Sequence, residues 1–589
     1  MQEHDHHEAP PEPTRWSSLV FLAKAKAHQF LRALKNWRRP MRKYPRDETL
    51  VDAPVIVAWQ CDLWREGNSP RERELQLGKV QNLRIAAQEL HGVEVPANEV
   101  WSFWKHLGRT TRAKGYARGR ELREGCIIPQ RGGGLCQLSG AIFNAALQAG
   151  LEIVERHAHT SSSIGSLARI NRDATVFWNY VDLRLQAPIP WRMEVSLSET
   201  QLTVRILCGK ALPQNAMESA PSSPAGALNT CATCGINSCF RSHPLDGEQT
   251  PDRTAVLVDE WWPEWDAYLT QNKHHHRTLF LPLDGKRWKK SNYAWDTRAH
   301  DRVRPHTLLA LQRALVSRRL RNEGASRQRT LIAWDEKMAQ AYAHRLQAAH
   351  SHLIVTQTLL PFLWRDGWLG GRSFDVLMTR LPMSDLHDYL DEASRRQPES
   401  TTSADFRADP TLIRHETEAL AAARHWVTPH RAIANLAGEK AVFLDWHLPP
   451  APKFKQAIAA PLRVAFPAST LCRKGAYELR EVALKLSLEV VALGGILEGA
   501  DFWEGVRLVP RGTHWLDDVH AVVLPAFVEH APRRLLEAVA AGVPVIASEV
   551  CGLNHLPGVT TIARGDAKAL ETELTKLQSH RTQSHPISG

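Results

Sequence analysis

The sequence lacks three features, each of which would have assigned the protein to a class. No run of about 18 apolar residues is present, so no membrane-spanning helix is expected. The first residues, Met-Gln-Glu-His-Asp-His-His, do not have the basic and apolar regions of a secretory signal peptide. No DNA- or RNA-binding signature occurs, so nucleic acid is not expected as a partner. These absences predict a cytoplasmic protein.

Cysteine is scarce, and its number is odd. Nine Cys in 589 residues do not indicate a disulfide framework, which agrees with a reducing cytoplasm. A chain of this length is expected to form three or four domains with large cores. The net charge of +11 favours anionic partners such as nucleotide sugars, lipid phosphates and anionic membranes.

Residues 1–49 form a basic N-terminal extension. Its apolar side chains fall roughly along one side of a helix: Trp16, Leu19, Val20, Ala23, Phe30, Leu34 and Trp37. The same stretch carries eight of the basic residues: Lys24, Lys26, Arg32, Lys35, Arg38, Arg39, Arg42 and Lys43. Two interpretations remain open. The helix lies on an anionic membrane, at its inner face, or it docks on its own domain.

Near the C-terminus the sequence has the pattern of strand, loop, helix and strand. Ala521 to Leu524 is apolar and β-prone, Leu535 to Ala541 consists of strong helix formers, and Val545 to Ala547 is a second short apolar strand. This is the unit of a parallel α/β sheet, and ligands of such sheets bind beyond the strand ends. Free N–H groups near Ala531 are expected to face that crevice and to favour a pyrophosphate.

Two carboxylates belong to this unit, Glu529 in the loop and Glu537 in the helix, with seven residues between them. Glu537 opens the run Glu-Ala-Val-Ala-Ala-Gly-Val-Pro-Val-Ile-Ala-Ser. The pattern resembles the glutamate–seven–glutamate signature of retaining glycosyltransferases of the GT-B fold. The resemblance implies that Glu537 holds the ribose of a nucleotide and that Glu529 lies by the donor sugar and its phosphates.

The segment Arg473-Lys474-Gly475 resembles the Lys-Gly that heads a helix in the same family. The resemblance implies that Lys474 neutralises the departing diphosphate, with Arg473 and Gly475 beside it. The family's other basic residue, six positions before the lysine, is Ala468 here. The positive charge that this position carries in the family would have to come from Arg473 or from an arginine elsewhere.

These motifs divide the C-terminal part of the chain. Residues 451–580 are expected to form the nucleotide-sugar domain. Residues 251–450 are expected to form the acceptor domain, with helices near 306–320 and 337–349.

A second resemblance covers residues 50–210. Its ordered motifs include Gly78-Lys79-Val80-Gln81-Asn82, Gly132-Gly133-Gly134-Leu135-Cys136-Gln137 and Asn179-Tyr180-Val181-Asp182-Leu183. This region resembles the VanW family.

The same motifs allow a chemical argument around Cys136. The thiol lies at the start of an expected helix, Leu135 to Leu147, where the helix dipole favours a thiolate. His157 or His159 is the candidate base, and an aspartate (Asp173 or Asp182) would orient it. The alternative is a buried structural cysteine.

Residues 211–250 are expected to be a linker with a cysteine cluster. Three thiols and one imidazole have a spacing that suits a structural tetrahedral zinc ion: Cys231, Cys234, Cys239 and His243. A reducible thiol cluster or a loop disulfide is the alternative.

Together the motifs predict an α/β protein in which a GT-B pair of Rossmann-like domains follows an α+β VanW-like domain. The expected reaction is the transfer of a sugar, with retention, from a nucleotide sugar to a glycan or lipid-linked acceptor of the cell envelope. In the alternative, the C-terminal half binds glycan or nucleotide without catalysis and positions a Cys136-based enzyme.

Overall fold

The computed structural model describes residues 15–38, 40–64, 70–123, 126–158, 172–212, 252–272, 276–319, 324–403, 407–455 and 461–584. The chain divides into two compact units. The first consists of Met1–Arg253, Leu346–His352 and Asp366–Ser373, and the second of Thr254–Arg345, Leu353–Arg365 and Phe374–Gly589. Within the described ranges, no helix combines the length and apolarity that crossing a membrane requires.

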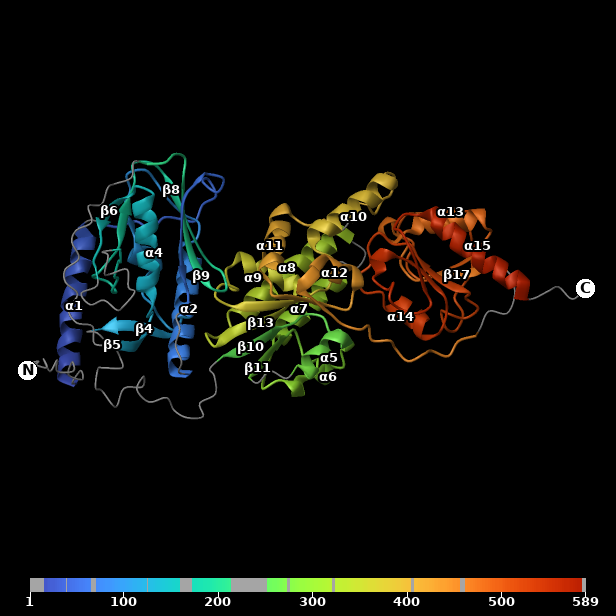
Figure 1. The fold of residues 1–589 in the computed structure, drawn as a ribbon, viewed down its shortest axis with the longest axis horizontal. Coiled ribbons are helices and arrows are strands. Elements are labelled where there is room, and N and C mark those ends of the chain that lie inside the picture. The colour runs from blue at the N-terminus through green and yellow to red at the C-terminus, as the bar shows by residue number, and fades with distance from the viewer. Residues whose placement is uncertain are drawn as a thin grey trace, which may run out of the picture. The chain divides into compact units, whose positions relative to one another are not determined.

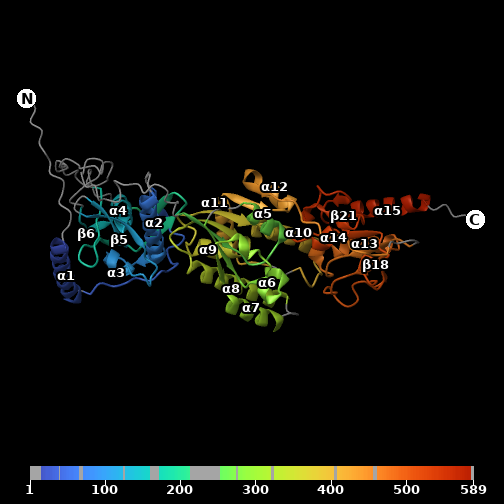
Figure 2. The same ribbon diagram turned by 90° about the horizontal axis from the view of Figure 1, so that it is seen from below.

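The first unit is an α+β domain built on antiparallel strand pairs (Figures 1 and 2). Its helices are α1 (Arg15–Arg38), α2 (Pro70–Leu90), α3 (Phe103–Leu107) and α4 (Leu135–Gln148). A four-stranded sheet has the order β1-β9-β8-β2, from Val55–Asp62, Gln201–Cys208, Trp191–Leu197 and Val93–Val95. Smaller sheets are β3-β7-β6 (Trp101–Ser102, Arg184–Gln186, Glu152–Glu155) and β4-β5 (Arg118–Arg123, Cys126–Arg131).

Helix α2 lies against β4 with backbone next to backbone. A Cβ atom on Gly78 would lie 1.8 Å from the carbonyl oxygen of Arg118, so only glycine fits there. The side chain of Asn82 on α2 stabilises the same contact. It accepts a hydrogen bond from the N–H of Ala117 at 2.8 Å and donates one to the carbonyl of Gly133 at 2.9 Å. The glycines of both motifs therefore bring the α2 backbone to the β4–β5 hairpin.

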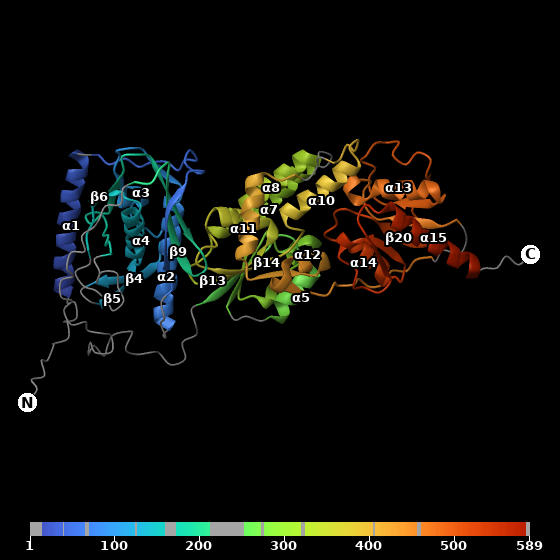
Figure 3. The ribbon, with the colours of Figure 1, turned by 45° about the horizontal axis from the view of Figure 1, so that its top comes forward.

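The second unit begins with a seven-stranded sheet of order β12-β11-β10-β13-β14-β15-β16. The pairs β10–β11, β11–β12, β14–β15 and β15–β16 are parallel. In chain order the strands are β10 to β16: Arg253–Leu257, Arg277–Leu281, Arg302–Pro305, His350–Thr356, Ser373–Leu377, His425–Thr428 and Ala441–Phe443. Helices α5 to α12 are Pro263–Gln271, Gly285–Trp288, Thr307–Arg319, Gly324–Ala343, Leu360–Arg365, Met383–Arg396, Pro410–Ala422 and Arg431–Ala437 (Figure 3).

A six-stranded parallel sheet follows, with the order β19-β18-β17-β20-β21-β22. In chain order, β17 to β22 are Arg463–Phe466, Glu489–Ala492, Arg507–Leu508, Ala521–Leu524, Val545–Ser548 and Val559–Ile562. Its helices are the short η6 (Cys472–Lys474), α13 (Ala476–Lys485), α14 (Arg533–Ala540) and α15 (Ala567–Ser584). The strand order reverses between β17 and β20, and ligands of such sheets bind where the order reverses.

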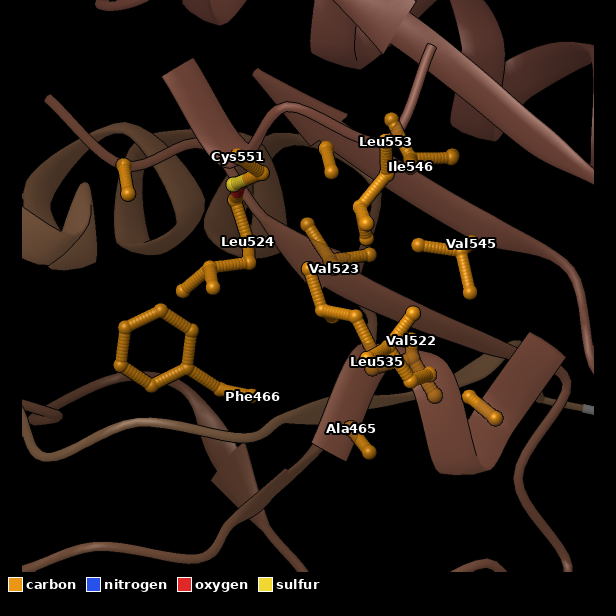
Figure 4. Close-up of a cluster of buried hydrophobic side chains, with 14 of the residues drawn as sticks. Ala465, Phe466, Val522, Val523, Leu524, Leu535, Val545, Ile546, Cys551 and Leu553 are labelled. Carbon is orange, nitrogen blue, oxygen red and sulfur yellow. The ribbon is translucent and has the colours of Figure 1, made fainter. Parts of the chain in front are cut away.

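The core of this second sheet consists of strands that are buried on both faces. Figure 4 shows Phe466 of β17, Val523 of β20 and Ile546 of β21 among apolar neighbours, and all four residues of β20 are buried. Continuous apolar strands are typical of parallel sheets covered by helices on both sides. The loops after β17 and β20 are therefore held by a rigid base.

Glu264 and Arg533 join the two sheets of the second unit. Arg533, the first residue of α14, binds the fully buried carboxylate of Glu264 on α5 through two contacts of 2.7 and 2.8 Å. Its guanidinium also lies over the rings of Trp262 and Trp446, at 5.0 and 5.2 Å from their centroids. We call this set the Arg533 bridge.

Most expected elements of the second unit are present. The strands expected at Ala521–Leu524 and Val545–Ala547 are β20 and β21, and the helix expected between them is α14. The helix expected near 337–349 is displaced, because α8 begins at Gly324 and ends at Ala343. The hydrophobic spacing of this stretch is weak, so its start could not be placed from the sequence.

Replacing Gly78 by Ala should destabilise the first unit by about 3 kcal/mol, because the new methyl group meets the Arg118 carbonyl oxygen and one of the two backbone segments must shift. Gly140→Ala in α4 is the matched control. Its nearest neighbour lies at 3.9 Å, so this substitution should leave stability unchanged or raise it by up to about 1 kcal/mol. Thermal unfolding of both variants measures the difference. Equal midpoints would contradict the backbone contact.

Candidate functional site

The candidate site lies where the loops after β17 and β20 meet. Gly475 ends the turn η6 with a φ of 74°, and a Cβ atom there would lie 2.1 Å from the carbonyl oxygen of Pro525. The N–H groups of Phe527 and Val528 both donate to the carbonyl of Arg473, at 2.9 and 3.1 Å. The absence of a side chain at position 475 thus lets the turn before α13 dock on the loop after β20.

This docking brings Lys474 onto Glu529. The Lys474 ammonium donates to the Glu529 carboxylate and to the carbonyl of Val528, each at 2.9 Å. The carboxylate also accepts from the N–H groups of His530 and Ala531, at 3.0 and 3.1 Å. Burial alone would raise the pKa of Glu529, but the ammonium and these N–H groups hold the pKa below its usual value.

The N–H groups near Ala531 are therefore occupied by the protein's own anion. The sequence predicted that they would be free for a pyrophosphate, and this was wrong because the carboxylate of Glu529 folds back onto them. A capping carboxylate at the start of a loop satisfies N–H groups that would otherwise be open.

His430 reaches the same loop from the other sheet. It follows β15, is fully buried, and its Nε2 lies 3.0 Å from the carbonyl oxygen of Glu529. Its ring lies against Gly552, where a Cβ atom would be 2.5 Å from Nδ1. Burial lowers the pKa of His430 to about 4, so the ring is neutral at pH 7. The neutral ring adds no charge beside Glu529.

A cavity of about 370 Å³ opens beside Lys474. Four residues from the second sheet's loops line it, namely Arg473, Lys474, Val528 and His530. The other lining residues belong to the part of the second unit built on the seven-stranded sheet. Eight of them are apolar residues or threonine: Ile332, Thr358, Phe362, Met383, Leu386, Leu390, Ala408 and Leu412. Its remaining polar residues are Gln328, Asp335, Arg380 and His387. The cavity is of a size that holds a small organic molecule.

Asp335 gives the cavity wall a carboxyl group with unusual protonation. The guanidinium of Arg313 lies 3.0 Å from Asp335 and 2.6 Å from Asp259, so two carboxyl groups share one cation. Burial, helped by the charge of Asp259, raises the pKa of Asp335 to about 8 in spite of Arg313. The raised pKa favours the protonated form of the Asp335 carboxyl group, which can donate a hydrogen bond.

Arg380, which lines the same cavity, is held by Glu416 behind it. Arg380 Nη2 lies 2.8 Å from the buried Glu416 carboxylate, which also accepts from the N–H of Met383. Sequence analysis missed Asp335, Arg380 and Glu416. Their positions in the chain are far apart, and no motif connects them.

Glu537 and Ala468 lie on other parts of the second sheet's rim. The carboxylate of Glu537 is 3.2 Å from Nε2 of His514, and Glu537 does not line the cavity. Next to Ala468, the carbonyl of Pro467 accepts a hydrogen bond from the guanidinium of Arg534. The structure thus places Arg473, Lys474, Gly475 and Glu529 together, and Glu537 with His514.

In the first unit, Cys136 occupies the second position of α4, as expected. Its Sγ lies 3.5 Å from Oγ1 of Thr175 and 3.8 Å from the carbonyl of Val176. His157 is exposed and contacts Glu155 at 3.2 Å, and Glu155 also binds Arg32. The side-chain partner of His157 in the structure is therefore Glu155.

The two aspartates proposed to orient the base have other partners. Asp182 accepts from the hydroxyl of Ser102 at 2.7 Å and from Arg184 at 2.9 Å. Asp173 binds Arg156 at 3.1 Å. The remaining candidate base, His159, lies outside the described residues.

The predicted zinc ligands also lie outside the described residues: Cys231, Cys234, Cys239 and His243. In the part of the chain that the structure describes, no group of three or more His, Cys, Asp or Glu side chains is placed to hold a metal ion.

Comparison with known families matches two regions of the chain. Residues 78–207 match the family described as "VanW like protein", and residues 475–580 match the family "Glycosyl transferases group 1". Both resemblances seen in the motifs are confirmed. The parallel sheets of the second unit and the antiparallel strands of the first agree with the predicted fold class.

Two curated relatives match the first region. Over 105 residues the chain is 39% identical to the uncharacterized protein YoaR of Bacillus subtilis, which is 18% of this chain and 34% of that protein. Over 161 residues it is 26% identical to the vancomycin B-type resistance protein VanW of Enterococcus faecalis, or 26% of this chain and 58% of that protein. The chain thus spans about a third of one relative and just over half of the other.

The chain also matches two solved structures at TM-scores below 0.5. Sucrose-phosphate synthase from Thermosynechococcus elongatus is 14% identical, with 56% of this chain and 90% of that chain covered and a TM-score of 0.33. Anabaena HepE in complex with UDP is 12% identical, with 56% and 90% covered and a TM-score of 0.32.

Replacing Asp335 by Asn should change how stability depends on pH. The pKa of the Asp335 carboxyl group is higher in the folded protein than in the unfolded chain. The group's contribution to stability is therefore fully present below about pH 4 and is lost as the pH rises towards about 8. Asparagine does not ionise. Between pH 5 and 8.5 the variant should therefore gain about 2 kcal/mol or more relative to the wild type. Thermal midpoints of both proteins across this range test it. Parallel curves would contradict a raised pKa.

Proposed function

Because the chain carries a VanW-like region and a glycosyl transferases group 1 region, we propose that its second unit transfers a sugar from a nucleotide sugar to an acceptor, with retention at the anomeric carbon. The observation that carries the proposal is the partly buried contact of Lys474 with Glu529 at the point where the strand order reverses. This point lies at the edge of the region that matches the transferase family.

Lys474 is the residue that receives the diphosphate. An ammonium group has three N–H donors, and two of them bind Glu529 and Val528. The third is available to a phosphate oxygen, and Arg473 lines the same cavity. A fixed cation stabilises the charge that develops on the leaving diphosphate, and it needs no rearrangement during the reaction.

Glu529 holds this cation in place and faces the donor sugar. Its carboxylate is engaged by one ammonium and two backbone N–H groups, which lower its basicity. We therefore assign Glu529 to positioning and not to attack on the sugar. The departing diphosphate then accepts the acceptor's proton, as the resemblance to retaining enzymes implies.

Arg534 supplies the charge that position 468 lacks. Its guanidinium is held at the carbonyl of Pro467, the residue before Ala468, at the carboxyl end of β17. Glu537 lies three residues further along α14 and binds the nucleotide ribose. His514, its present partner, would release the carboxylate or share it when the ribose binds.

The cavity beside Lys474 receives the acceptor. Six apolar side chains from α8, α9, α10 and α11 line it, which suits an acceptor with an apolar part, such as a lipid-linked glycan. In its protonated form, which its raised pKa favours, Asp335 can donate a hydrogen bond on the same wall. The cell envelope is our proposal for where this acceptor belongs.

A second candidate function is recognition without catalysis. The observation that favours it is the Glu529 carboxylate, which occupies the N–H groups at the head of the loop and leaves fewer donors for a phosphate. In that case the second unit binds a glycan or nucleotide, and the chemistry lies at Cys136 in the VanW-like region.

Nucleoside diphosphates should stabilise the protein if the donor site works. At about 100 times its Kd, the preferred nucleotide should raise the thermal midpoint by about 5 °C. Glu537→Ala and Lys474→Met should each remove most of this shift. Glu481→Ala, which removes an exposed carboxylate from α13, should leave it unchanged.

Turnover of the matching nucleotide sugar then separates the two candidate functions. Release of nucleoside diphosphate that depends on Lys474 supports the transferase. Stabilisation without turnover, for every acceptor offered, supports the binding module. No shift with any nucleotide contradicts the transferase and leaves glycan binding as the second unit's function.

A further inference from the structure

Helix α1 docks on the first unit through a polar side. Ala25 is buried, and Gln29 donates to the carbonyl of Trp178 at 2.7 Å. Arg32 binds the carboxylate of Glu155 and the carbonyl of Tyr180, each at 2.8 Å, and Asn36 accepts from Arg184 at 3.0 Å. Residues spaced in this way lie on one face of a helix. The face that touches the protein therefore holds hydrogen bonds and an ion pair.

The opposite side of α1 is apolar and faces away from the protein. Its large side chains have high exposed fractions: Leu19 59%, Phe30 70%, Leu31 60%, Leu34 40% and Trp37 79%. At about 100° per residue, this stripe is centred roughly opposite the Ala25 face. In Figures 1 to 3, α1 forms the outer edge of its unit. A soluble domain normally has the reverse arrangement, with the apolar side inward.

The exposed charged residues of α1 are all basic, and they flank the apolar stripe. No Asp or Glu occurs between Arg15 and Arg38. Lys26 lies on one side of the stripe, and Lys24, Lys35 and Arg38 lie on the other, all of them exposed. An apolar stripe flanked by exposed cations, with no acidic residue on the helix, is the pattern of a helix that lies in the plane of an anionic bilayer surface.

Among the described residues, none covers the stripe, whose large side chains stay exposed. The 14 residues before α1 contain no Leu, Ile, Val, Phe, Tyr or Trp with which to cover it. A second copy of α1 would bring six basic residues against six more without an acidic residue between them.

We propose that α1 binds the surface of an anionic lipid bilayer, with Phe30, Leu34 and Trp37 entering the interface and the flanking lysines at the phosphates. The contacts of Gln29, Arg32 and Asn36 stay with the first unit, so the helix joins that unit to the membrane. This inference does not depend on the transferase activity.

Flotation of the full-length protein with vesicles tests the proposal. Vesicles of phosphatidylglycerol and phosphatidylcholine should bind at least about tenfold more protein than vesicles of phosphatidylcholine alone, and salt should weaken the binding. The double variant Phe30→Ser/Trp37→Ser should bind about tenfold less. Lys26→Glu/Lys35→Glu should lose at least as much, because each reversal replaces an attraction by a repulsion.

Matched controls come from the second unit. Leu497→Ser removes a side chain that is 56% exposed, and Lys290→Glu reverses an exposed cation, and both should leave binding unchanged. All substituted side chains are exposed, and thermal midpoints will show that folding is intact. Equal binding by wild type and the Phe30/Trp37 variant would overturn the proposal, as would failure to bind anionic vesicles. A dimer in solution that this variant abolishes would identify a second copy as the partner instead.

Discussion

The candidate site depends on one partly buried ion pair, Lys474 with Glu529. An ammonium group withdrawn from water needs a matching charge and hydrogen-bond acceptors, and here a carboxylate and a backbone carbonyl supply them. The pair exists because Gly475 allows two loops to approach within a distance that no side chain permits. The contact of His430 with the Glu529 carbonyl then ties the first sheet to the same loop. These contacts hold the loops whose residues Arg473, Lys474, Val528 and His530 line the cavity.

The first unit manages its buried charges in a different way. Arg84 donates to the carbonyl of Gly370 at 2.6 Å, and Arg372 donates to the carbonyl of His350 at 2.7 Å. Burial lowers the pKa of Arg372 to about 9, and its charge is compensated by backbone dipoles. Some of the net charge of +11 is thus inside the protein. The cations that remain to attract anionic partners gather on particular surfaces, of which α1 is the clearest.

Local patterns predicted the second sheet well. The apolar runs of β20 and β21 and the helix formers of α14 are short-range signals, and they gave both the elements and their order. Lys474 and Glu529 are 55 positions apart, and only the resemblance to a family placed them in one site. Asp335 and Arg380 belong to no motif, and the elements that carry them meet only through tertiary packing. The occupied N–H groups at Ala531 depend on the rotamer of Glu529, which the sequence does not specify.

The Arg533 bridge has a consequence for how the two sheets of the second unit move. Glu264 is fully enclosed and its main cation belongs to the other sheet, so a swing that parted α5 from α14 would strand a carboxylate without its counter-ion. The ion pair therefore opposes this movement in the protein alone, without any bound ligand. Arg533 is also one helical turn from Glu537, so the bridge fixes the tilt of the helix that carries it. The two sheets are therefore preorganised, and a ligand entering between them spends little of its affinity on closing them.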